Sequence, residues 1–115
     1  MKVQLQGQHL RLRIDESELA VLGDGGTLEN VTRFGTHEWR QTLRQGDAAD
    51  PTMQADAGCC AIEIPKRLVD AYAARLPCRE GLGVSLQPIV GPVLRVDLEV
   101  DVRDSVRARR PRRES

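Results

Sequence analysis

The sequence predicts an α+β fold that is mainly β: an antiparallel curled sheet or partly open barrel of about seven short strands with two short helices. Three observations predict this fold. Residues 94–102 alternate apolar and polar side chains without error, as a half-buried strand does. Other runs alternate in the same way and are joined by short turns, which favours antiparallel pairing. Residues 68–76 instead space their apolar side chains as a helix does.

The first half of the chain predicts four strands and one helix. Residues 3–14 alternate on both sides of a tight turn at Gly7, and residues 27–34 and 39–44 predict a second hairpin. Between the two hairpins, Asp15 and Glu18 have the spacing of a capping box, which begins a helix. We expect the glycine-rich run at residues 23–26 to end that helix, because glycine tolerates a left-handed backbone.

The second half follows a similar order. Residues 53–57 and 59–64 predict short strands, and Pro65 then begins a helix because it lacks the amide that a first turn leaves unbonded. Pro77 ends this helix, and residues 84–86 and 94–102 predict the last strands. One face of the helix is expected to close the sheet through Leu68, Val69, Tyr72 and Leu76.

The 115 residues are long enough for one domain, which we place at residues 1–102. Residues 103–115 carry six arginines against two acidic residues, a net charge of +4, and the body before them carries −4. We expect this tail to be disordered and to act as a solubilising end, with a nucleic-acid tether as the alternative.

Composition also bears on location. No stretch approaches the ~18 apolar residues of a membrane-spanning helix, and the first residues lack the apolar core of a signal peptide. Three cysteines, two of them adjacent, do not form a disulfide framework. These features predict a cytoplasmic protein without a membrane partner.

The catalytic patterns are weak, and we predict no catalytic residue, no metal ligand and no cofactor. Cys59 and Cys60 would point to opposite faces of a strand, so they are poorly placed to share a metal. Cys78 or His37 leaves a small thiol or metal-dependent enzyme as a remote alternative.

Two rows of charge point to structural pairing. Arg11 and Arg13 share the polar face of one predicted strand, and Asp97, Glu99 and Asp101 share that of another. If the two strands are neighbours, these rows form cross-strand salt bridges. The alternative, a general acid–base pair of carboxylates, is the less favoured interpretation.

The stretch Ile64-Pro65-Lys66-x-Leu68-Val69, followed by Gly83-x-Ser85-Leu86 and a final strand, resembles swapped-hairpin regulators of the AbrB and antitoxin type. In that family the pattern spans about 45 residues and forms an intertwined dimer that binds DNA through basic arms. The resemblance is limited to residues 61–100, and acidic residues in the final strand here would repel phosphate. A DNA-binding regulator or antitoxin is therefore the alternative function.

A broader resemblance covers residues 1–102. Lys2, Gly7, the run Leu10-Arg11-Leu12-Arg13 and Ser17-Glu18-Leu19 are similar to the opening of a family of small uncharacterised bacterial proteins. Thr32-x-Phe34-Gly35, Leu43, Ile62-x-Ile64-Pro65 and Leu98-Glu99-x-Asp101 follow in the family's order. The resemblance implies a compact bacterial cytoplasmic domain without catalytic residues. The arginine-rich tail departs from the family's acidic one.

Together these observations favour a non-catalytic binding or interaction domain, with a second copy of the chain, another protein or an acidic molecule as its candidate partner. The candidate partner-binding residues are the basic ones of the predicted strand, helix and tail: Arg11, Arg13, Lys66, Arg67, Arg107, Arg109, Arg110, Arg112 and Arg113.

Overall fold

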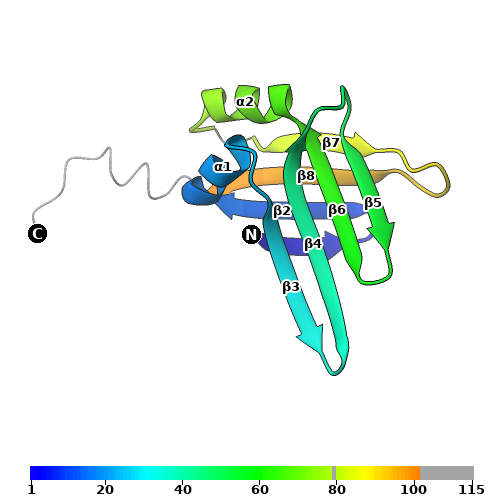
Figure 1. Cartoon of the computed structure of the whole chain (residues 1–115). Coiled ribbons are helices and arrows are strands. Elements are labelled where there is room, and N and C mark those ends of the chain that lie inside the picture. The colour runs from blue at the N-terminus through cyan, green and yellow to red at the C-terminus, as the bar shows by residue number, and fades with distance from the viewer. Residues whose placement is uncertain (79, 102–115) are drawn as a thin grey trace, which may run out of the picture.

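The computed structural model describes residues 1–78 and 80–101, which form eight strands and two helices. Figure 1 shows two sheets that cross face to face, with both helices at one end of the front sheet. The elements are β1 (Lys2–Gln6), β2 (His9–Asp15), α1 (Glu16–Gly23), β3 (Leu28–Phe34), β4 (His37–Gly46), β5 (Thr52–Asp56), β6 (Cys59–Pro65), α2 (Lys66–Arg75), β7 (Leu82–Leu86) and β8 (Leu94–Asp101).

Each sheet has four strands. Sheet A has the order β1-β2-β8-β7, and sheet B has the order β3-β4-β6-β5. The four hairpins are antiparallel, as the sequence predicted, but the central pairs β2–β8 and β4–β6 are parallel. The mainly β, two-helix prediction is therefore confirmed, whereas the single antiparallel curled sheet or partly open barrel of about seven strands is wrong.

The two halves of the chain repeat one order of elements, ββαββ. Strands β5 and β6 and the start of α2 lie 50 residues after β1, β2 and α1. Strand pairing follows the repeat: Leu12 lies opposite Leu98 in sheet A, and Ile62 lies opposite Leu43 in sheet B. Ile62 is 50 residues after Leu12, and Leu43 is 55 before Leu98, so the sheets are related by an approximate twofold.

The halves are interleaved, because each contributes one hairpin to each sheet. The inner faces of both sheets meet in a core of aliphatic side chains with one aromatic ring, that of Tyr72. This core is built from Leu10, Leu12, Ile14, Leu22, Leu28, Leu43, Ile62, Ile64, Val69, Tyr72, Leu82, Val84, Leu86, Val96, Leu98 and Val100.

The helices begin as the sequence indicated, with one adjustment. The Asp15 carboxylate accepts the Glu18 amide at 2.8 Å and the Glu18 carboxylate accepts the Asp15 amide at 3.1 Å, which confirms the capping box. The Glu18 amide and the Ser17 hydroxyl, which both donate to the Asp15 carboxylate, lower its pKa. Pro65 is the last residue of β6 and the residue before α2, not the first helical residue.

The core face of α2 agrees with the prediction. Val69 and Tyr72 are buried, and Leu68 and Leu76 pack against the core while partly exposed. The amide of Val100 donates to the Tyr72 hydroxyl oxygen at 3.0 Å. Strand β7 pairs with β8 only as far as Leu98, so no β7 residue lies opposite Val100. The hydroxyl of Tyr72 on α2 therefore accepts the Val100 amide in place of a β7 carbonyl.

Candidate functional site

The predicted cross-strand salt bridges are present on the outer face of sheet A. Arg11 lies opposite Asp97 and Arg13 opposite Glu99, because β2 and β8 are neighbours. Arg11 Nε lies 3.9 Å and Arg13 Nη2 lies 3.6 Å from the Glu99 carboxylate. The two arginines are therefore paired with carboxylates and do not form a purely basic patch.

The other basic candidates lie elsewhere. Lys66 Nζ is 2.9 Å from the Asp70 carboxylate one helical turn on, and Arg67 donates to the carbonyl of Ala49 at 2.8 Å. The structure thus separates the α2 pair from the sheet A pair. Arg107, Arg109, Arg110, Arg112 and Arg113 lie outside the described residues.

Among residues 1–78 and 80–101, no basic side chain bonds to a cysteine thiol. All three cysteines are free and half-buried, and burial raises the pKa of Cys60, which reduces its thiolate fraction. The Cys78 thiol donates to the carbonyl of Glu80 at 3.1 Å. Within residues 1–78 and 80–101, no three His, Cys, Asp or Glu side chains gather where they could hold a metal ion.

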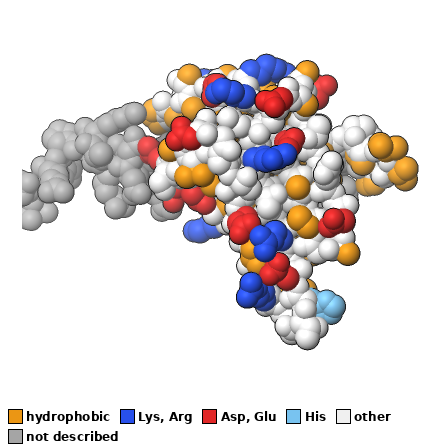
Figure 2. Space-filling model, viewed as in Figure 1, with side chains coloured by type: hydrophobic (Ala, Val, Ile, Leu, Met, Phe, Trp, Pro, Cys, Tyr) orange, Lys and Arg blue, Asp and Glu red, His pale blue; other side chains and the backbone are white. Residues whose placement is uncertain are grey.

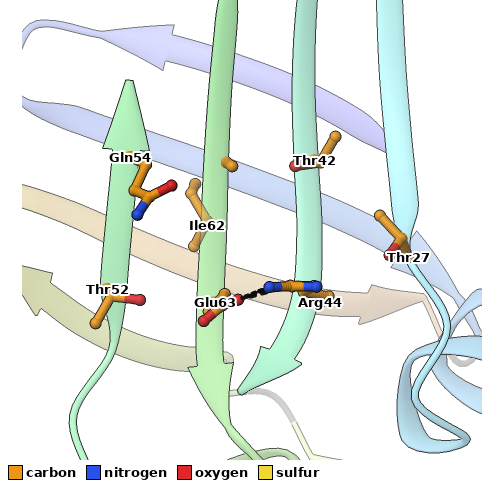
Figure 3. A pocket seen from close by; sticks show the side chains of 8 residues that line it. Thr27, Thr42, Arg44, Thr52, Gln54, Ile62 and Glu63 are labelled. Carbon is orange, nitrogen blue, oxygen red and sulfur yellow. Dashed lines mark hydrogen bonds and ion pairs between the residues drawn. The ribbon is translucent and has the colours of Figure 1, made fainter. Parts of the chain in front are cut away.

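A shallow hollow of about 270 Å³ lies on the outer face of sheet B. Figure 3 shows its polar walls, with the Arg44 Nε donating to the Glu63 carboxylate at 2.6 Å across the floor. Its lining residues are Thr27, Thr42, Arg44, Thr52, Gln54, Ala61, Ile62 and Glu63.

Sheet A carries a matching hollow of about 220 Å³, lined by Lys2, Val3, Gln4, Arg11, Arg13 and Glu99. The repeat relates the two hollows: Arg13 occupies the place of Glu63, and Glu99 that of Arg44. Both hollows therefore contain an ion pair, but the acidic and basic residues have exchanged strands between them. Both hollows are lined by polar groups and neither is a deep apolar cavity, so they fit a small-molecule site poorly.

The exposed large hydrophobic side chains have a clear distribution. Of the seven among the described residues, five lie on two hairpins that are equivalent in the repeat. The β3–β4 hairpin carries Phe34, 59% exposed, and Trp39, 40% exposed; the β7–β8 hairpin carries Ile89, Val90 and Val93 in its connection. Figure 2 shows the apolar β7–β8 connection projecting from the body.

The β3–β4 hairpin reaches beyond the rest of sheet B. Strand β6 begins at Cys59, which lies opposite Arg40, so residues 37–39 have β3 as their ladder partner and no strand on the other side. Figure 1 shows the hairpin extending past β1, the edge strand of sheet A. Phe34 and Trp39 share the face of the buried Leu43, so they continue the core face beyond the second layer.

Hydrogen bonds and ring contacts hold these aromatic side chains. Gln41 is 5% exposed, and the neighbouring Trp39 indole N–H, which can only donate, assigns the orientation of its side-chain amide: the oxygen faces the indole N–H and accepts from it. In the same orientation the Gln41 amide nitrogen donates to the carbonyl of Asn30 at 3.3 Å. The rings of Phe34 and His37 are 6.1 Å apart.

The opposite face of the hairpin is charged but internally paired. Arg33 Nε lies 3.1 Å from Glu38, and Arg40 bonds both Glu38 at 3.0 Å and Glu29 at 2.7 Å. The hydrogen bonds from Arg40 and Arg33 lower the pKa of Glu38. The carboxylates of Glu38 and Glu29 in turn raise the pKa of Arg40. Signs alternate along this face in Figure 2.

Sequence reasoning missed this aromatic surface, because it took only basic side chains as candidate partner-binding residues. A signal was available in the sequence. Phe34 and His37 flank the two-residue turn Gly35-Thr36, and side chains beside a hairpin tip are seldom buried.

The architecture defines a class of protein: a small, mainly β domain made of two interleaved ββαββ halves. The chain belongs to a family of unknown function (DUF7009), whose model matches residues 1–101. This match confirms the resemblance to an uncharacterised family. No curated protein and no solved structure matches the chain significantly. No helix in the described part of the chain is long and apolar enough to cross a membrane.

Proposed function

We propose that this domain is a non-catalytic protein-interaction module of the bacterial cytoplasm, and that it binds through the inner face of the β3–β4 hairpin. The observation that carries the proposal is the exposure of Phe34 and Trp39 where the hairpin has no second layer. Aromatic side chains dominate the centres of protein interfaces because each buries a large area with little loss of rotamer freedom.

Three further features support the proposal. The hydrogen bond to Gln41 orients Trp39 before any partner arrives, which reduces the ordering cost of binding. The outer-face ion pairs keep both hairpin strands in one register. The free state of all three cysteines accords with a reducing compartment.

An affinity-capture comparison tests the proposal. The bait proteins are the wild type, the double variant Phe34→Ser/Trp39→Ser, and Val21→Ser, which changes a side chain on α1 that is 46% exposed. We expect the wild type and Val21→Ser to retain the same partner proteins and the double variant to lose at least ~90% of them, since truncating hot spots commonly costs 2 kcal/mol or more. Equal recovery by all three baits would contradict the proposal.

A second candidate function is that of a DNA-binding regulator. One observation favours it: the two repeated units of the chain interleave their hairpins, as swapped-hairpin regulators do, and the Ile64-Pro65 junction lies in the second unit. The described faces of both sheets oppose it, because their arginines are paired with carboxylates. A mobility-shift titration at several salt concentrations decides. The absence of binding at low salt excludes the regulator, and binding that disappears when residues 103–115 are deleted indicates only a basic tether.

A further inference from the structure

One of the two edges of sheet B is formed by β3, the longest of the four edge strands. It has seven residues, whereas β1, β5 and β7 have five each. An edge strand presents unpaired backbone N–H and C=O groups, to which another strand can bond. The inference below rests on the proposed function and names the partner of the β3–β4 hairpin.

The register of the hairpin determines which groups face that edge. Phe34 and His37 flank a two-residue turn, and such a pair exchanges both of its backbone hydrogen bonds. Alternate residues of β3, counted back from Phe34, therefore bond β4. The remaining three, Glu29, Val31 and Arg33, direct their backbone groups toward the free edge.

We infer that β3 pairs antiparallel with β3 of a second copy of this chain, about a twofold axis at Val31. In this register Val31 lies opposite Val31 of the second copy, and Glu29 lies opposite Arg33 in both directions. All three outward-facing residues of each strand then find a partner, which gives about six backbone hydrogen bonds. Shifting the axis by one residue toward either end would leave one of the three unpaired.

The side chains agree with the same register on both faces. On the outer face, the two Glu29–Arg33 pairs place opposite charges across the junction. On the inner face, the exposed ring of Phe34 comes opposite Leu28 of the second copy, which is 6% exposed, so the ring lies at the edge of the partner's apolar core. This self-complementarity identifies a second copy as the occupant, since an isologous contact requires one strand to complement itself.

Two reciprocal charge variants test the inference by sedimentation equilibrium of the full chain. We expect the wild type to dimerise, and Glu29→Arg alone or Arg33→Glu alone to weaken the dimer at least ~10-fold, because each homodimer would place like charges opposite each other twice. An equimolar mixture of the two variants should restore a dimer, since every cross-strand pair is then of opposite charge. Val93→Ser, on the other hairpin, should dimerise as the wild type does.

Val31→Pro is an additional test variant. It is used in place of either charge variant if circular dichroism shows that the charge variant does not fold. Its amide points to the edge, so proline removes hydrogen bonds between copies but none within the hairpin. The inference is overturned if the wild type is monomeric at every concentration, if the single variants dimerise unchanged, or if the mixture does not recover. A monomeric wild type combined with partner loss in Phe34→Ser/Trp39→Ser would refute the inference and leave the proposed function standing.

Discussion

Tyr72 joins α2 to β8 through a single hydrogen bond in the core. Removal of its hydroxyl in Tyr72→Phe leaves the buried amide of Val100 without its acceptor, at a cost of roughly 1–3 kcal/mol in the free energy of unfolding. Urea denaturation monitored by circular dichroism measures this difference. Tyr72→Asp should unfold the domain, because it places a carboxylate at a fully buried position. An unchanged urea midpoint in Tyr72→Phe would show that the bond contributes nothing.

The same side chain predicts a pH dependence. Burial raises the pKa of Tyr72 above its ordinary value, and the amide of Val100 that bonds the hydroxyl oxygen opposes the shift only in part. The neutral phenol is thus favoured in the folded state. Its contribution to stability is fully present below about pH 10 and is lost as the pH rises through the higher folded-state pKa.

Tyr72 is the only tyrosine, so tyrosinate absorbance reports this titration directly. The folded midpoint should exceed that of the urea-unfolded chain. Coincident midpoints would contradict the burial argument.

At the scale of elements, the charged face of α2 is expected to contribute little to stability. Lys66 forms an exposed ion pair with Asp70, and Arg67 donates one exposed hydrogen bond to the carbonyl of Ala49. Lys66→Ala and Arg67→Ala should each change the free energy of unfolding by no more than ~0.5 kcal/mol. Chemical denaturation tests this. If either change abolished binding of a captured partner while stability held, α2 would replace the hairpin as the binding element.

The individual elements were the most predictable part of the fold. Strict alternation identified β8, the Asp15–Glu18 spacing identified the start of α1, and helical spacing identified the core face of α2. These signals are local, because side-chain period and capping depend on neighbouring residues. The pairing of Arg11 and Arg13 with carboxylates of β8 was expected only if the two strands are neighbours, and the structure shows that they are.

At the scale of the whole molecule, the sequence predicted less. Alternation shows which face of a strand is buried, but not which strand lies beside it. Hairpins could be assigned from their turns, whereas the parallel pairs β2–β8 and β4–β6 join residues far apart in the chain. The overhang of β3–β4, and with it the exposure of Phe34 and Trp39, depends on the lengths of strands in the other half. Local patterns therefore place Phe34 beside a hairpin tip, but they do not show that the inner face of the hairpin lacks a second layer.

Interleaving predicts that the halves hold together without a covalent link. Residues 47–51 connect them, from Gly46 on one side of β6 to Thr52 on the other. If a specific protease site replaces residues 48–50 and is cut, both fragments should co-elute in size-exclusion chromatography and separate only in denaturant. Each sheet takes two strands from each half, so separation would expose the core of both. Fragments that part without denaturant would contradict the interleaved architecture, and the uncut insertion variant is the control.

The central claim is that the inner face of the β3–β4 hairpin contacts a protein. Its most direct test is to incorporate a photo-crosslinking amino acid at position 34 and to irradiate living cells that produce the protein. Position 21 on α1, which is also exposed, serves as the matched control. We predict covalent adducts from position 34, including one of twice the chain mass if β3 pairs with a second copy, and few from position 21. Adducts from position 21 with none from position 34 would contradict the claim.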